Sequence, residues 1–344
     1  FEIRKQKYWD IDLNRIDSGI SEDDAADKFR ELFYDSVKKR LRSDVPVGSS
    51  LSGGLDSSLV VCVIDELIKG GSVKQKTFSA RFPGFAKDEG PFMQKVIDKT
   101  NVEPFFTFPD NAGLVEKINK VAWHQEEPFG SASICVQYDV MKLARDNGVI
   151  VLLDGQGADE VLAGYHYYYN AYFQEVRINN PSEYKKVLEE YKTLHAGNVI
   201  NASVAPGGLK KSIRNAFPAL IKPYFQARLK YREIVNPTFS KEFTRSFNDD
   251  SYLDNNLNLY SENSLNGSLY YSTFVKGLSE LLRYADRNSM AHSREVRLPF
   301  LSHHLVEFLF TLPASYKINQ GWTKYIMRKA YNELLPPEIT WRKD

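Results

Sequence analysis

The chain of 344 residues has little of what marks secreted, metal-binding or membrane-spanning proteins. Its two cysteines, Cys62 and Cys135, stand in apolar surroundings, which excludes a disulfide scaffold and fits buried thiols in a reducing compartment. The six histidines show no metal-ligand spacing, and no apolar run approaches the ~20 residues that a membrane span needs. Lys+Arg (45) and Asp+Glu (44) leave a net charge of +1, which argues against a nucleic-acid partner. We therefore expect a cytoplasmic globular protein that binds neither nucleic acid nor membrane.

What the chain does have is a glycine-rich turn between a predicted strand (residues 45–51) and a predicted helix (residues 56–69). The turn reads Ser52-Gly53-Gly54-Leu55-Asp56-Ser57-Ser58. Free backbone N–H groups and a helix N-terminus then meet at one point, where an anion can sit. A carboxylate at Asp56 would repel a bare phosphate, which suggests Mg²⁺ between them. The alternative is that these residues only turn the chain and cap the helix. No Lys follows the glycines, so this is not a Walker loop.

A second acidic turn, Asp154-Gly155-Gln156-Gly157-Ala158-Asp159-Glu160, follows residues 149–153, which are apolar on both faces as in a covered parallel strand. Further strands are predicted at 76–82 and 104–108, alternating with helices. This pattern predicts an α/β fold with a doubly wound parallel sheet. Ligands bind off the carboxyl ends of such strands, so Asp159 could join Asp56 on one Mg²⁺. The alternative is a pair of solvated loop acids, and Glu160 could orient the loop or cap the next helix.

Strand patterns fade after about residue 200. We predict helices at 228–235, 273–291, 302–310 and 324–335, a loop at 249–266, and a mainly helical C-terminal region folded against the sheet. The expected organisation is a linker at 1–20, a nucleotide-binding α/β domain at 21–200 and a helical part at 201–344.

Several motifs together carry a resemblance to a known family. They are the turns at 52–58 and 154–160, Arg294-Glu295-Val296-Arg297-Leu298-Pro299-Phe300-Leu301, Gly321-Trp322-Thr323-Lys324 and Trp341-Arg342-Lys343-Asp344. The first resembles the PP-loop of ATP pyrophosphatases, and the set is similar to the synthetase domain of the asparagine synthetase family, in the family's order. The resemblance implies a sheet of the adenine nucleotide alpha-hydrolase type. It also implies a piece of a longer protein whose N-terminal glutaminase domain is absent from this chain.

The resemblance implies roles for individual residues. A Lys matching Lys324 contacts the phosphates in the family, Arg297 is either a cation on the phosphate side or a structural partner of Glu295, and Gln156 is the third candidate catalytic residue. The metal ligands would be Asp56 and Asp159. The residues expected to hold ATP and pyrophosphate are Leu51, Ser52, Gly53, Gly54, Leu55, Asp56, Ser57, Ser58, Ala80 and Gly155.

The implied activity is ATP-dependent amide synthesis through an acyl-adenylate, with ATP and Mg²⁺ as cofactors. The acceptor would be aspartate or a similar carboxylate, held near residues 126–131, and ammonia would come from the glutaminase domain. A homodimer is a candidate assembly. Asparagine-forming members usually carry Glu where this chain has Gln156, and an amide cannot titrate. That departure keeps open another carboxylate or amine, and a non-catalytic nucleotide-binding relic is the alternative of another class.

Overall fold

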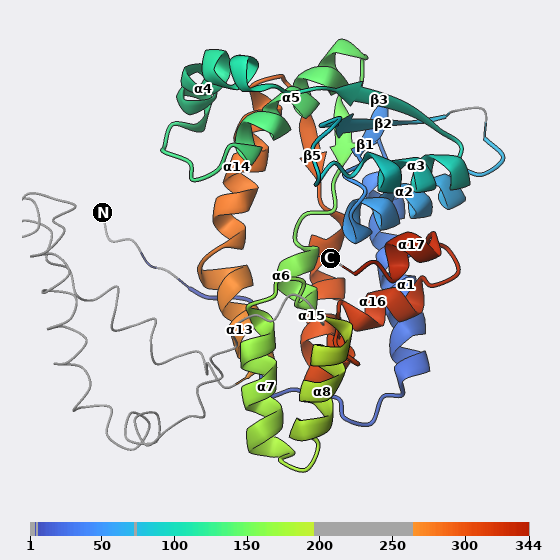
Figure 1. The fold of residues 1–344 in the computed structure, drawn as a ribbon, viewed down its shortest axis with the longest axis vertical. Helices are drawn as coiled ribbons and strands as arrows, with labels where there is room; N and C mark the ends of the chain where they lie inside the picture. Colours follow the sequence, from blue (N-terminus) through green and yellow to red (C-terminus); the bar gives the residue numbers. More distant parts are fainter. Residues whose placement is uncertain (1–3, 5, 72–73, 196–263, 344) are drawn as a thin grey trace, which may run out of the picture. The chain divides into compact units, whose positions relative to one another are not determined.

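The computed structural model describes residues 4, 6–71, 74–195 and 264–343. Its centre is a five-stranded parallel sheet in the order β3-β2-β1-β4-β5 (Figure 1). The strands are β1 (Val47–Ser50), β2 (Gln75–Ala80), β3 (Val102–Thr107), β4 (Val151–Leu153) and β5 (Glu295–Arg297). The chain runs from β1 outward to β3 and then crosses to β4 on the other side of β1. The carboxyl ends of β1 and β4 therefore flank the point where the strand order reverses, which is where ligands bind in such sheets. The doubly wound parallel sheet predicted above is confirmed.

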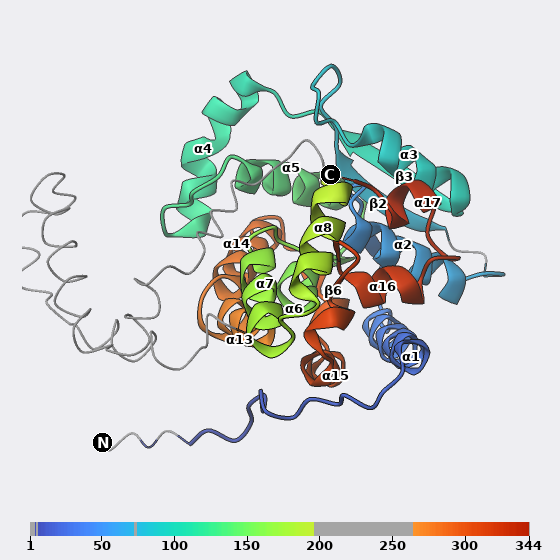
Figure 2. The same ribbon diagram turned by 60° about the horizontal axis from the view of Figure 1, so that its bottom comes forward.

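Helices cover both faces of the sheet (Figures 1 and 2). On one side α5 packs on β2 and β3, and its Met141 and Ala144 form a core with Phe78 and Leu152. On the other side α2 packs on β1 and β2, with α3 and α1 against it. The helices up to β4 are α1 (Glu22–Arg40), α2 (Leu55–Leu67), α3 (Gly90–Lys99), α4 (Asn111–Gln125) and α5 (Ser133–Asp146).

Local sequence explains why α1 and α2 form. Ser21 caps α1 by accepting a hydrogen bond from the Asp24 amide, and acidic residues in its first turn and basic ones in its last suit the helix dipole. The residues of α2 from Ser57 to Ile64 are all buried, and Gly70, with a φ of 86°, follows its last turn. β4 has no exposed residue, as its apolar run predicts.

The C-terminal half contributes to the same sheet. Sequence analysis missed β5, which pairs with β4 along Glu295–Arg297. The predicted loop at 249–266 is wrong at its end, because Leu265 begins α13 and is buried. The predicted helix at 228–235 lies outside the described residues. The remaining elements are α6 (Ala158–Leu162), α7 (Tyr168–Asn179), α8 (Tyr184–Leu194), α13 (Leu265–Tyr270), the π-helix η1 (Tyr271–Val275), α14 (Leu278–Met290), the 3-10 turns η2 (Pro299–Leu301) and η3 (Ala314–Tyr316), α15 (His303–Thr311), the hairpin of β6 (Ile318–Asn319) and β7 (Trp322–Thr323), α16 (Tyr325–Ala330) and α17 (Pro337–Thr340).

A buried histidine lies between α14 and β5. His292 is 4% exposed, and its ring centroid lies 4.2 Å from that of Tyr138. Burial, with a smaller contribution from the nearby cations Arg145, Lys120 and His124, lowers the pKa of His292 to about 4. Between about pH 4 and 6.5 the folded state therefore binds fewer protons here than the unfolded state does.

We expect this residue to make the protein less stable as the pH falls through that window. Its contribution to the free energy of unfolding should drop by about 2–3 kcal/mol from pH 6.5 to 4, since one pKa unit corresponds to about 1.4 kcal/mol. Urea denaturation at a series of pH values would measure it, with His292→Phe as the comparison because phenylalanine keeps an aromatic ring beside Tyr138. Identical pH profiles for the two proteins would contradict this assignment.

Candidate functional site

The turn after β1 presents backbone amides at the N-terminus of α2. Gly54 is the N-cap of this helix and provides no side-chain capping bond. The hydroxyls of Ser52 and Ser57 lie 2.9 Å apart, and they also bond to loop backbone, since Ser57 accepts from the Ser52 amide at 3.1 Å and Ser52 from the Gly54 amide at 3.2 Å. Ser52 is exposed, while Ser57 and Ser58 are buried. The start of the turn, at Ser52, is therefore open to solvent, whereas its end, at Ser57 and Ser58, is packed at the start of α2.

The second turn lies against the first. A β-carbon on Gly155 would come within 2.8–2.9 Å of the backbone of Asp56 and Ser57, so only glycine permits this approach. Asp154 begins the turn, and its amide donates to the Arg297 carbonyl of β5 at 3.0 Å. Burial raises the pKa of the Asp154 carboxyl, opposed by hydrogen bonds from the turn's own amides. The two turns thus form one surface at the reversal of strand order.

Lys324 joins both turns. Its ammonium Nζ lies 2.7 and 2.6 Å from the two carboxylate oxygens of Asp56 and 2.6 Å from Oδ1 of Asp159. The side chain of Lys324 is 9% exposed, against 18% for Asp56 and 33% for Asp159. These three side chains therefore lie together, whereas their roles in binding Mg²⁺ and phosphate stay predictions. We call these three residues the Lys324 cluster.

The charges of the Lys324 cluster favour the binding of a further cation. Two carboxylates against one ammonium leave a net charge of −1 in a partly buried place. Burial raises the pKa of Asp56 to about 6, and Asp159 adds to the effect, while Lys324 opposes it. Burial lowers the pKa of Lys324, but the two carboxylates outweigh it and the pKa is raised. The ammonium is therefore held in its charged form.

Backbone geometry also marks this cluster. Lys324 has a φ of 54°, a left-handed conformation that costs about 1 kcal/mol or more for a residue other than glycine. Gly164 lies directly against the cluster, because a β-carbon there would meet Asp159 Oδ1 at 1.8 Å and Lys324 Cε at 2.3 Å. Sequence analysis missed Gly164, since a single glycine after α6 carries no signal of its own.

The other predicted residues lie in different surroundings. Leu51 is buried at the end of β1, where its carbonyl accepts from the Ser79 hydroxyl, and Ala80 is half-buried at the end of β2. Gln156 is half-buried, and among the described residues its Oε1 has no hydrogen-bond partner. The side chain of Arg297 is engaged elsewhere: it pairs with Glu295 at 2.6 Å and donates to the carbonyls of residues 40 and 42. The structural alternative for Arg297 fits these contacts, and its guanidinium has no recorded contact with the Lys324 cluster.

The loop expected to hold the acceptor faces cations from α14. Glu126, with a φ of 59°, pairs with Arg287, and Glu127 pairs with Arg283. Sequence analysis did not single out these arginines, because the pairing joins segments far apart in the chain. In the aromatic segment Tyr165-His166-Tyr167-Tyr168-Tyr169, Tyr168 and Tyr169 are buried and pack in the core, whereas Tyr167 is 55% exposed.

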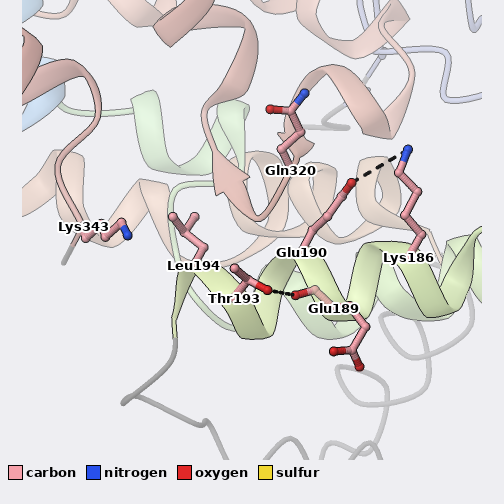
Figure 3. A pocket seen from close by; sticks show the side chains of 7 residues that line it. All are labelled: Lys186, Glu189, Glu190, Thr193, Leu194, Gln320 and Lys343. Atoms are coloured by element: carbon pink, nitrogen blue, oxygen red, sulfur yellow. Dashed lines mark hydrogen bonds and ion pairs between the residues drawn. The ribbon is translucent and has the colours of Figure 1, made fainter.

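Two cavities lie away from the Lys324 cluster. The larger, about 420 Å³, is lined by α8 residues together with Gln320 and Lys343, and Lys186 pairs with Glu190 along its wall at 3.8 Å (Figure 3). The smaller, about 200 Å³, lies between α4 and α5, next to the segment that joins β3 to α4. Neither is lined by Asp56, Asp159 or Lys324.

The donor set suits magnesium shared with phosphate. Among the described residues no group of three or more His, Cys, Asp or Glu side chains could hold a metal ion alone. Asp56 and Asp159 direct hard carboxylate oxygens toward one point, which the Lys324 ammonium also contacts. A further cation would offset the net negative charge of the cluster. Mg²⁺ is usually held by one or two carboxylates plus substrate phosphates. The residues present therefore fit the ion in the presence of a phosphate ligand.

The parallel sheet, the glycine-rich turn at its reversal point and the facing acidic turn define an α/β protein of the PP-loop type. Residues 28–343 match the family model described as asparagine synthase. The chain belongs to this family. None of the described helices combines the length and the apolar character needed to cross a membrane.

Individual relatives extend the comparison. Asparagine synthetase [glutamine-hydrolyzing] 1 of Bacillus subtilis (strain 168) is 30% identical over 328 residues, covering 94% of this chain and 49% of that protein. A putative asparagine synthetase 2 of Methanocaldococcus jannaschii is 40% identical over 172 residues, which cover 50% of this chain and 32% of the relative. Amidase chry2 of Gibberella zeae is 24% identical, with 96% of this chain and 54% of the relative covered. The chain thus spans about half the length of the curated relatives it matches.

Proposed function

We propose that this chain is the ATP-using part of an amide-forming ligase. A carboxylate oxygen attacks the α-phosphorus of ATP, the bond to the β-phosphate oxygen breaks, and pyrophosphate leaves. A nitrogen nucleophile then attacks the acyl carbon of the acyl-adenylate, and AMP leaves with the former carboxylate oxygen. The observation that supports this most is the Lys324 cluster, in which one ammonium and two carboxylates lie together beside the glycine-rich turn.

Most of the residues expected at the site have a part in this proposal. The backbone amides of the turn at 52–58 would bind the β- and γ-phosphates, with Leu51, Ala80 and Gly155 beside the nucleotide. Lys324 would steady the negative charge that develops on the phosphates. Mg²⁺ held by Asp56 and Asp159 would offset charge on the leaving pyrophosphate. Arg297 is left out, because its guanidinium is engaged with Glu295 and backbone carbonyls.

The first candidate acceptor is the β-carboxylate of aspartate, with ammonia derived from glutamine as the nucleophile. It is supported by the family and by the asparagine synthetases among the relatives. A second candidate is another carboxylate or another amine. It is favoured by Gln156, whose amide cannot accept or release a proton as a carboxyl group does, and by a relative named as an amidase.

One assay tests both the chemistry and the acceptor. The protein is incubated with ATP, Mg²⁺, ammonium and one carboxylic acid at a time, and pyrophosphate and AMP are measured. We expect aspartate to raise the release of both products in equal amounts above the rate with ATP alone. Release that depends on another acid and not on aspartate would select the second candidate.

ATP binding is tested separately. ATP–Mg²⁺ at 100 times its Kd should add about 2.7 kcal/mol to the free energy of unfolding. No acid-dependent pyrophosphate together with no stabilisation by ATP–Mg²⁺ would overturn the proposed function.

A further inference from the structure

The last described segment of the chain binds along α3, the helix whose start contacts the glycine-rich turn. Arg342 Nη1 donates to Glu89 Oε1 at 2.7 Å, and the Arg342 guanidinium carbon lies 4.0 Å from the centroid of the Phe92 ring. At the other end of α3, Lys99 Nζ donates to the carbonyls of Glu333 and Leu335 at 2.9 and 3.2 Å. Residues 333–342, which we call the C-terminal strap, are thus attached along the whole of α3.

The start of α3 in turn supports the glycine-rich turn. A β-carbon on Gly53 would lie 3.0 Å from the Glu89 carbonyl oxygen and 3.1 Å from the Met93 amide nitrogen. The φ of Gly53 is 81°, so this residue meets α3 in a conformation that glycine adopts readily. A displacement of Glu89 would therefore move the amides of this turn.

The C-terminal strap also holds the turn that carries Lys324. Arg328 Nε donates to the Thr323 carbonyl at 2.8 Å, and its Nη1 donates to the Thr340 carbonyl in the strap. The Arg328 guanidinium carbon lies 5.0 Å from the centroid of the Trp322 ring, which packs edge-on against Trp341 at 5.3 Å. Arg328 is 6% exposed, so this connection is buried.

We infer that Arg342 is a positioning residue that sets the distance between the glycine-rich turn and Lys324. It connects the strap to the first turn of α3 on one side, and the strap holds the Lys324 turn on the other. The planar guanidinium both pairs with Glu89 and stacks on Phe92, which a flexible ammonium does not reproduce. The expected effect on nucleotide binding rests on the proposed function. The mechanical connection from Arg342 through α3 to the glycine-rich turn does not depend on that function.

The test uses four variants of the chain: Arg342→Ala, Arg342→Lys, Glu89→Gln and, as a matched control, Lys95→Ala. Lys95 also joins α3 to the strap through Glu338 at 2.9 Å, but both side chains are half exposed, so this ion pair contributes little. Two quantities are measured: the Kd of ATP–Mg²⁺, and, without nucleotide, the hydrogen exchange of the amides at residues 52–56.

We expect Arg342→Ala and Glu89→Gln each to weaken ATP–Mg²⁺ binding about tenfold and to speed exchange at residues 52–56. Arg342→Lys should fall between Arg342→Ala and the wild type, and Lys95→Ala should match the wild type. A fifth variant that combines Arg342→Ala with Glu89→Gln should bind no more weakly than Arg342→Ala alone, since both changes act on the same ion pair.

The outcomes separate this inference from the proposed function. Unchanged exchange at residues 52–56 in Arg342→Ala would overturn the inference, and so would equal effects of Lys95→Ala. A lower melting temperature with unchanged exchange and unchanged Kd would make Arg342 structural only, which also overturns it. Faster exchange in Arg342→Ala, combined with a wild type that does not bind ATP–Mg²⁺, would refute the proposed function and leave the mechanical connection standing.

Discussion

Lys324→Met is expected to lower acid-dependent pyrophosphate release by at least about a hundredfold, the usual loss when one donor to developing charge is removed. The ammonium lies within 2.7 Å of both carboxylates, and methionine keeps much of the side-chain volume without the charge. Asp56 and Asp159 would then repel each other without a cation between them. The free energy of unfolding should also fall by about 2 kcal/mol, less than for a fully buried pair because Asp159 is a third exposed.

Lys329→Met is the matched control for this experiment. Lys329 lies on α16, the helix that Lys324 precedes as N-cap, but it pairs with Glu22 at 3.0 Å and Asp23 at 2.9 Å on α1. It should change the free energy of unfolding modestly and leave pyrophosphate release unchanged. Release is compared at saturating ATP, after circular dichroism has shown both variants to be folded. A folded Lys324→Met protein with the wild-type rate would remove Lys324 from the catalytic set.

The fold could be predicted where local sequence carries the signal. The capping hydroxyl of Ser21 and the apolar spacing after it define α1, and the uniformly apolar residues of β4 define a covered strand. β5 has no such signal. Its three residues, Glu295–Arg297, include two charged ones, and they form a strand only because they pair with β4 at the edge of the sheet. Pairing over this distance is not encoded in periodicity.

The site likewise combines residues that local sequence predicts with residues that only distant contacts bring together. Asp56 and Asp159 could be placed together by reasoning, because each follows a strand and these strands are neighbours. Lys324 is 268 residues from Asp56, and only the family resemblance brought it to the site. The direction of the Arg297 side chain depends on the carbonyls of Arg40, the last residue of α1, and Arg42, which no motif describes. The spacing of the motifs therefore predicts that the two acids lie together, but it does not predict the cation that pairs with them.

Gly164→Ala is expected to reduce acid-dependent pyrophosphate release by about a hundredfold while the protein stays folded. The new β-carbon would overlap Asp159 Oδ1 at 1.8 Å and Lys324 Cε at 2.3 Å. Both are outer parts of side chains rather than backbone, so the contact is relieved by moving these groups apart, which breaks the pair between them. The free energy of unfolding should change by about 1 kcal/mol or less, because alanine restricts the unfolded chain more than glycine does and offsets part of the strain.

Gly19→Ala is the control, since Gly19 is exposed and a β-carbon there meets only Asp17 Oδ1 at 3.6 Å, an ordinary contact. The two variants carry the same chemical change, so a difference between them reports on the surroundings of each glycine. Pyrophosphate release and the thermal unfolding midpoint are measured for both. Gly19→Ala should keep the wild-type rate. If Gly164→Ala kept it as well, the close contact of Asp159 with Lys324 would be dispensable for the chemistry, and the two residues would act through a more open arrangement than the one this structure describes.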